Sequence, residues 1–318
     1  MPSVFLDYET VSRGDLDPQV LKDALPDLVL YGTSDPQQVR ERSADARVIC
    51  VNKALIGREV MEHAPHLELI ALAATGSNNI DHRCARERGI AVCNIRDYCT
   101  DSVAQHVWGA ILTLTHHLGE YAQLARNGAW ARHPHFTMLD YPVRELRGLN
   151  LGIVGWGSLG AAVGRLGEAF GMRILIANRA GGMAVPGRLD LPDLLRAADI
   201  VSLHCPLNDA TRGLIGREQL ALMKREALLI NTARGGLVDS RALADALRAG
   251  LIGGAAIDVL NQEPPVNGDP LLEAGIRNLL LTPHIAWSAR EARQRCLADM
   301  AANIRDFYAG GQRGRLNL

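Results

Sequence analysis

Three glycines mark the segment 151–160, which reads Leu151-Gly152-Ile153-Val154-Gly155-Trp156-Gly157-Ser158-Leu159-Gly160. An apolar run typical of a buried strand precedes Gly155, and a helical pattern follows it. Gly155 permits a tight turn, Gly157 lets the backbone approach a pyrophosphate, and Gly160 lets the helix pack close to the strand. The free N–H groups of the helix N-terminus would bind the phosphates. The segment therefore predicts a dinucleotide-binding unit, with Gly155, Trp156, Gly157, Ser158, Leu159 and Gly160 near the cofactor; the alternative is a glycine-rich turn without a ligand.

Short apolar runs alternate with helical patterns on both sides of this segment, as in parallel-sheet α/β proteins. The predicted strands are Val4–Tyr8, Leu28–Tyr31, Val48–Val51, Leu67–Ala74, Ile90–Cys93, Leu149–Val154, Arg173–Ala177, Ile200–His204, Ala227–Asn231, Gly254–Val259 and Asn278–Leu281. The predicted helices include Ile80–Arg88, about Asp101–Arg126, Ser158–Phe170, Leu191–Ala198, Ser240–Ala249 and about Ser288–Tyr308. We expect an α/β fold with two parallel-sheet domains, Rossmann-like or flavodoxin-like, of which only the second carries a dinucleotide fingerprint.

Composition narrows the class of protein. A chain of 318 residues is longer than one hydrophobic core usually serves, which favours two domains. The formal net charge is -1 and no basic stripe stands out, so nucleic-acid binding is not expected. No signal peptide and no apolar run long enough for a membrane span is visible. The six cysteines form no CxxC pair or zinc-type cluster, so we expect no metal and a cytoplasmic location with reduced thiols.

The choice of cofactor depends on two residues. The strand 173–177 ends at Asn178-Arg179, where an acidic residue would accept hydrogen bonds from the ribose 2′-hydroxyl of NAD. Asn178 does not repel a 2′-phosphate, and the Arg179 guanidinium could pair with one. The sequence therefore favours NADP over NAD, although Arg179 as a solvated loop residue would leave both cofactors possible.

Three chemically distinct side chains follow predicted strands of the second series. Arg234 lies in Asn231-Thr232-Ala233-Arg234, Glu263 follows the strand 254–259, and His284 follows the strand 278–281. Ligands of open α/β sheets bind at the carboxyl edge of the strands, so we expect the three side chains to converge there.

These three residue types match the reduction of a 2-oxo acid. A guanidinium pairs with the substrate carboxylate, and an imidazole delivers the proton that the reduced carbonyl oxygen needs. A carboxylate beside the imidazole favours its protonated form. Each residue alone is more often structural, but together, downstream of a dinucleotide loop, they predict that Arg234, Glu263 and His284 are catalytic.

At this point the sequence resembles the D-isomer-specific 2-hydroxyacid dehydrogenase family over nearly its whole length. Three ordered motifs carry the resemblance: 151–160, 194–206 with Thr211, and 223–239. It implies that Arg234 orients the substrate, that Glu263 supports the histidine and that His284 is the acid/base. It also implies that Asp258 holds the nicotinamide carboxamide. The remaining cofactor contacts that we expect are His204, Cys205, Pro206, Thr211, Thr232, Ala233 and Ala286.

The resemblance further implies how the chain is divided. The NAD(P)-binding domain (100–286) would be inserted into a substrate-binding domain (1–99 plus 287–318), and the long helix after residue 100 would help to build a homodimer. The motifs are most similar to the glycerate dehydrogenase (hydroxypyruvate reductase) subgroup. In that subgroup the backbone N–H groups of the segment matching 73–81 face the substrate carboxylate, and the segment 51–53 also looks like the subgroup. We therefore expect the substrate to be bound by Asn52, Lys53, Thr75, Gly76, Ser77, Arg234 and His284; the alternative for 75–79 is an ordinary strand-to-helix turn.

The expected reaction is hydride transfer between NAD(P)H and a small 2-oxo acid, with hydroxypyruvate/D-glycerate or glyoxylate/glycolate as the substrate pair. Two alternatives remain open at this stage. One is a dinucleotide-sensing regulatory protein on the same scaffold, since a fold does not fix a function. The other is a dehydrogenase for phosphoglycerate or another longer 2-hydroxy acid. A methyltransferase, which also has a glycine-rich loop, is disfavoured by the Arg/Glu/His series.

Overall fold

The computed structural model describes residues 2–317. Within them the chain forms two compact units. One, called here the terminal unit, contains the residues up to Cys99 together with those from Trp287 onward. The other, the central unit, is Thr100–Ala286. Among residues 2–317, no helix has both the length and the apolar character needed to cross a membrane.

A five-stranded parallel sheet forms the middle of the terminal unit, in the order β2-β1-β3-β4-β5. Its strands are β1 (Ser3–Phe5), β2 (Leu28–Leu30), β3 (Val48–Val51), β4 (Leu69–Leu72) and β5 (Ala91–Cys93). This 2-1-3-4-5 order is that of flavodoxin-like folds, in which ligands bind at the carboxyl ends of the strands.

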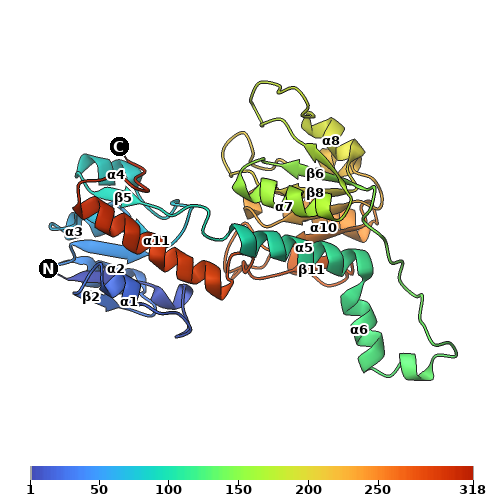
Figure 1. Ribbon diagram of the computed structural model, residues 1–318, viewed down its shortest axis with the longest axis horizontal. Coiled ribbons are helices and arrows are strands. Elements are labelled where there is room, and N and C mark those ends of the chain that lie inside the picture. The colour runs from blue at the N-terminus through green and yellow to red at the C-terminus, as the bar shows by residue number, and fades with distance from the viewer. Residues whose placement is uncertain (1, 318) are drawn as a thin grey trace. The chain divides into compact units, whose positions relative to one another are not determined.

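Helices cover both faces of this sheet because successive strand residues point to opposite sides. On one face, Phe5 and Cys50 pack with α1 (Gln19–Lys22) and α11 (Arg290–Tyr308). On the other face, Val4 and Ile49 pack with α2 (Pro36–Ser43), α3 (Arg58–His63) and α4 (His82–Glu87). Figure 1 shows that α11, the last helix of the chain, lies along the sheet formed by the N-terminal strands.

The central unit contains a six-stranded parallel sheet in the order β11-β10-β9-β8-β6-β7. Its strands are β6 (Asn150–Val154), β7 (Arg173–Ile176), β8 (Ile200–Leu203), β9 (Leu228–Asn231), β10 (Gly254–Ile257) and β11 (Leu279–Leu281). This is the Rossmann order without a full strand beyond β7. An isolated bridge between Ala177 and Leu189 lies where that strand would begin.

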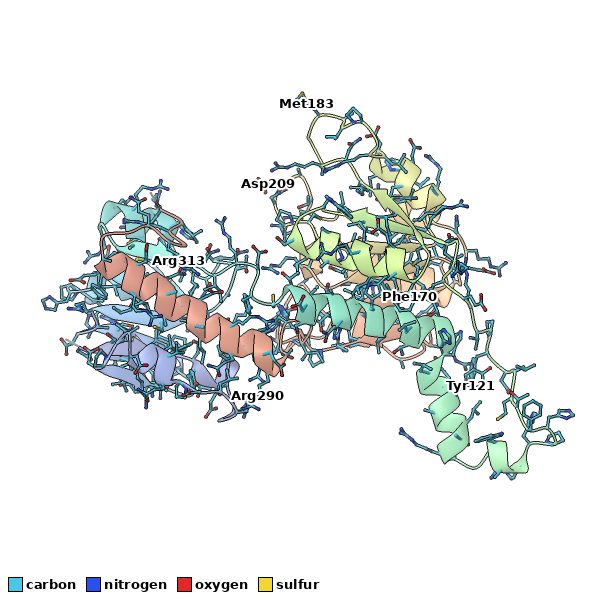
Figure 2. The ribbon with its side chains drawn as sticks, viewed as in Figure 1. Tyr121, Phe170, Met183, Asp209, Arg290 and Arg313 are labelled. Atoms are coloured by element: carbon cyan, nitrogen blue, oxygen red, sulfur yellow. The ribbon has the colours of Figure 1, made fainter. Side chains whose placement is uncertain are left out.

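Two groups of helices enclose the central sheet. On one face α5 (Thr100–His116) packs on α7 (Ser158–Ala169), where Trp108 stacks on Phe170 at 4.6 Å between ring centroids. Phe170, which directly follows α7, is labelled in Figure 2. On the other face the buried side chains of α8 (Leu191–Ala197), α9 (Arg217–Leu222) and α10 (Ser240–Arg248) share a core with the strands. Four short 3-10 helices complete the described elements: η1 (Tyr8–Thr10), η2 (Trp130–Arg132), η3 (Gly235–Leu237) and η4 (Pro270–Leu272).

The prediction of one helix over 101–126 is wrong. The helix breaks at His117, whose backbone is left-handed (φ 50°), and α6 (Leu118–Arg126) starts in a new direction (Figure 1). Tyr141 holds this break in place: its ring stacks on His117, and its carbonyl accepts a hydrogen bond from the hydroxyl of Tyr121.

The two-sheet α/β fold is confirmed. All eleven predicted strands overlap an observed strand. The first of them ends early, at Phe5 instead of Tyr8, because the chain turns into the 3-10 helix η1, where Tyr8 donates its N–H to the carbonyl of Tyr31.

Candidate active site

The glycine-rich turn follows β6, and its geometry requires glycine at two positions. Gly155 has φ +103°, and a Cβ there would meet the backbone N of Cys205 at 2.5 Å. A Cβ on Gly160 would overlap the carbonyl oxygen of Gly155. Gly157 differs, because no heavy atom lies within 4 Å of the Cβ position at the start of α7. That open cradle at a helix N-terminus fits the pyrophosphate of a dinucleotide.

The cradle continues along the carboxyl edge of the sheet. After β8, His204 Nε2 lies 2.8 Å from the hydroxyl of Ser202. Its Nδ1 is buried without a partner among the described residues, as is the hydroxyl of Thr232 after β9. Burial lowers the pKa of His204 to about 4, so its ring is neutral at physiological pH. Two unpaired polar atoms at neighbouring strand ends are consistent with a polar ligand along this edge.

Several other predicted cofactor residues have structural contacts. Asn178 donates to Asp190 Oδ1 at 2.9 Å and accepts from the N–H of Val185, so its amide folds the loop after β7. The Thr211 hydroxyl donates to the carbonyl of Pro206 at 2.7 Å and closes that turn. The exposed Arg179 follows Asn178 in the same loop.

Burial also affects the cysteine after β8. The side chain of Cys205 is half-buried, which raises the pKa of its thiol. The thiol form is therefore favoured over the thiolate.

The loop after β9 fixes the backbone around Arg234. Asn231 accepts from the N–H of Ala233 and donates to the carbonyl of Arg234, and the Arg234 guanidinium bonds to the carbonyl of Ala233 at 2.7 Å. Gly235 packs so closely on the backbone of Leu260 that a Cβ would not fit. The loops after β9 and β10 are therefore in direct contact.

Glu263 and His284 are within hydrogen-bond distance of each other in the central unit. His284 Nδ1 lies 2.6 Å from Glu263 Oε2, and the side chains are 26% and 35% exposed. The second carboxylate oxygen, Oε1, accepts the N–H of Leu260 at 2.8 Å. The carboxylate is thus anchored to its own loop, and the pair stays accessible to a ligand. His284 also has a left-handed backbone (φ 55°), which is uncommon for a residue other than glycine.

Asp258 holds that unusual backbone. Its buried carboxylate accepts from the hydroxyl of Thr282 at 2.6 Å and from the N–H groups of Ile285 and Ala286 at 2.9 Å each. Its carbonyl accepts the N–H of His284. The ring of His106 on α5 lies 3.8 Å from the same carboxylate. The role of Asp258 toward the nicotinamide stays a prediction, and sequence reasoning did not include His106.

The predicted substrate segments lie at the carboxyl ends of strands in the terminal unit. Asn52 and Lys53 follow β3, and 75–77 follow β4. The carbonyl of Thr75 accepts from the side chain of Asn94 at 2.7 Å, and the hydroxyl of Ser77 lies 2.8 Å from His82 Nε2. A residue that sequence reasoning missed, Asp7, accepts hydrogen bonds from the loop that carries Lys53.

Comparison with known proteins identifies the family to which this architecture belongs. Residues 108–286 match the family model described as D-isomer specific 2-hydroxyacid dehydrogenase, NAD binding domain. The chain belongs to the D-isomer specific 2-hydroxyacid dehydrogenase family. The resemblance inferred from the motifs is confirmed, and with it the assignment to NAD- or NADP-dependent oxidoreductases.

Named relatives within this dehydrogenase family span most of the chain. A glycerate dehydrogenase of Methylorubrum extorquens is 41% identical over 278 residues, covering 87% of this chain and 88% of the relative. A hydroxypyruvate reductase of Blautia hydrogenotrophica is 36% identical over 317 residues, covering 98% of each chain. A solved structure of an NADPH-dependent glyoxylate/hydroxypyruvate reductase from Sinorhizobium meliloti has a TM-score of 0.82 at 28% identity, covering 99% of this chain and 98% of that one.

Proposed function

We propose that this dehydrogenase reduces hydroxypyruvate or glyoxylate, and oxidises D-glycerate or glycolate in the reverse direction. The observation that carries the proposal is the Glu263–His284 pair, which lies past β10 and β11 on the sheet whose β6 leads into the open glycine cradle. The names of the relatives support a small 2-oxo acid as substrate. A bound nicotinamide would supply the hydride that reaches the substrate carbonyl carbon.

The side chains divide the remaining chemistry among them. His284 is the acid/base: Glu263 accepts at Nδ1, so Nε2 is the nitrogen that gives the proton to the carbonyl oxygen and takes it back in oxidation. The Arg234 guanidinium orients the substrate carboxylate as a planar donor. In the terminal unit, Lys53 and Thr75–Ser77 are the further substrate contacts that we propose. Asn52, which the sequence also suggested, is buried and donates its amide to Thr10, so we do not propose it as a contact.

For the cofactor we propose NADP in preference to NAD. Asn178 carries no charge at the position where NAD-binding proteins of this fold have an acid, and the exposed Arg179 beside it can pair with a 2′-phosphate. The nearby Asp190 opposes such a phosphate, so we expect a preference of limited size. The remaining cofactor contacts that we propose are those expected above, from Gly155–Gly160 through Ala286.

We propose that two copies associate through an apolar arm, defined here as residues 118–143. Phe136 is 90% exposed and Leu139 is 86% exposed, an unusual arrangement for a surface that only water covers. Tyr121, labelled in Figure 2, lines a cavity of about 250 Å³ in the arm together with Trp130 and Phe136. A second copy of the chain is the occupant that we propose, because every copy carries the same exposed apolar surface and a two-fold interface joins identical surfaces. A cytoplasmic location, consistent with six unpaired cysteines, completes the proposal.

The test is oxidation of NADPH and of NADH in the presence of hydroxypyruvate, glyoxylate or pyruvate, followed by the loss of nicotinamide absorbance. His284→Ala is the matched loss-of-function control, and it should bind NADPH as wild type does while losing turnover. Tight cofactor binding without turnover on any of the three acids would contradict the proposal and favour a dinucleotide-sensing protein.

A further inference from the structure

Asp7 is a buried carboxylate that accepts three backbone hydrogen bonds from the loop after β3. Oδ1 accepts the N–H of Asn52 at 2.9 Å, and Oδ2 accepts those of Lys53 at 2.6 Å and Ala54 at 2.8 Å. Only 5% of Asp7 is exposed. Three N–H donors compensate for the burial of one negative charge, so the contact is strong and specific.

The carbonyl groups of the same loop are held by Asn79. The Asn79 amide donates to the carbonyl of Ala54 at 2.9 Å and to that of Asn52 at 3.4 Å. The backbone carbonyl of Asn79 accepts the N–H of Ile56 at 2.8 Å. Asn79 lies two residues beyond Ser77, so these bonds join the loop 52–54 to the segment 75–79. Two segments that are distant in sequence thereby form one cross-linked edge of the terminal unit.

This arrangement determines which atoms of the loop can meet a substrate. The N–H groups of residues 52–54 point at Asp7, so they are not donors to an acid. The Asn52 amide also donates to the hydroxyl of Thr10 at 2.9 Å. What the loop presents to solvent is the exposed side chain of Lys53. A cationic side chain on a backbone held at both its N–H and its carbonyl groups suits the binding of a small carboxylate anion.

We propose that Asp7 is a positioning residue: it fixes the backbone of the loop 52–54 and so directs Lys53 toward the anionic 2-oxo acid. The inference rests on the proposed function, because it assumes that Lys53 contacts the substrate. Asp7 itself does not touch the substrate in this scheme, and it takes no part in cofactor binding, which belongs to the central unit.

The variant Asp7→Asn tests the inference in the full-length protein. A carboxamide keeps the volume, but its NH2 group faces an N–H donor whichever way it is oriented, so at least one hydrogen bond is lost. We expect the KM for hydroxypyruvate to rise about ten-fold, with kcat changed less than about three-fold. The Kd for NADPH, measured by tryptophan fluorescence, should stay at the wild-type value. Asp35→Asn, which removes the carboxylate that caps α2 in the same unit, is the matched control and should leave KM unchanged.

A double-mutant cycle separates positioning from simple stabilisation. In a Lys53→Ala background, Asp7→Asn should raise KM no further, because the residue through which it acts is absent. Asn79→Ala releases the carbonyl groups of the loop and should also raise KM, which keeps the inference testable if Asp7→Asn does not fold. A lower melting temperature with wild-type KM in both variants would overturn it, as would additive effects in the cycle. An inactive wild type that still binds NADPH would instead overturn the proposed function, and the inference with it.

Discussion

His284 Nδ1 lies 2.6 Å from Glu263 Oε2, and the other oxygen of that carboxylate accepts the N–H of Leu260 at 2.8 Å. The carboxylate therefore orients the imidazole and is itself held by its own loop. This relationship assigns the proton on Nδ1 to the contact with Glu263, and Nε2 is the nitrogen that we propose for proton exchange with the substrate.

Replacing Glu263 by Gln should lower kcat by about 10- to 100-fold, because a neutral amide is a weaker acceptor for Nδ1 than a carboxylate and orients the imidazole less firmly. The Kd for NADPH should not change. Glu226→Gln, at an 82% exposed side chain, is the control for the loss of one negative charge. Equal kcat values for Glu263→Gln and wild type would contradict the role assigned to Glu263. The measurement is steady-state turnover with hydroxypyruvate.

The second prediction concerns Asp258 and the thermal stability of the protein. Asp258→Ala removes the acceptor of three hydrogen bonds, from Thr282, Ile285 and Ala286, in a buried setting. Because hydrogen bonds to a charged group contribute more than neutral ones, we expect a loss of about 3 kcal/mol, or roughly 10 °C in Tm. Asp258→Asn should lose less, because it keeps the volume and one acceptor. Thermal denaturation of both variants gives the comparison, and an unchanged Tm in Asp258→Ala would count against this account of the loop.

The parts of the molecule that could be predicted from sequence are those determined by residues close together in the chain. Apolar runs between turn-forming residues located every strand. The spacing of Gly155, Gly157 and Gly160 identified the cradle because the positive φ of Gly155 and the close approach of Gly160 to the Gly155 carbonyl are local constraints. The carboxyl-edge rule then placed Arg234, Glu263 and His284 past strands of one sheet. The contact between Glu263 and His284 follows from that rule and from the adjacency of β10 and β11.

What could not be predicted depends on contacts between distant segments. The helical pattern runs through His117 without a glycine or proline at that position. The contact that accompanies the break is the packing of Tyr141 on His117, which the local sequence does not reveal. The clamp on the loop 52–54 requires knowing that β1 and β3 are neighbours, which places Asp7 beside Lys53. Likewise, Asn178 followed the expected strand, but its bond to Asp190 depends on how the loop after β7 returns.

Cofactor preference gives a third prediction. Arg179→Ala should weaken NADPH binding by about three- to ten-fold and leave NADH binding unchanged, since one exposed cation near a phosphate contributes on this scale. Arg196→Ala, which removes an exposed guanidinium paired with Asp193, is the control. Fluorescence titrations of both cofactors measure the ratio of Kd values. A ratio that does not move would remove Arg179 from the proposed 2′-phosphate site.

The apolar arm gives a fourth prediction. Phe136→Asp and Leu139→Asp place charges on its two most exposed apolar side chains and should convert a dimer into a monomer, because a charge cannot be buried unpaired at an interface. Met183→Asp is the control, since Met183 is 90% exposed and lies outside the arm. Light scattering coupled to size-exclusion chromatography reports the mass. A monomeric wild type, or a dimer that survives both substitutions, would refute the arm as the interface.

His204 gives a fifth prediction, on the dependence of stability on pH. Its pKa falls from the ordinary value of 6.5 to about 4 because burial penalises the charged ring. Between these two pH values the unfolded chain binds a proton that the folded protein does not bind. The free energy of unfolding therefore decreases as the pH falls through this window, and above pH 6.5 His204 causes no such loss. The loss should reach about 3 kcal/mol near the lower end. His204→Gln, which keeps a polar group near Ser202, should be destabilised relative to wild type above pH 7 and should approach or exceed it near pH 4. Melting curves of the two proteins across this range test the idea: parallel curves down to acid pH would show that His204 is protonated in the folded state and that burial does not keep it neutral.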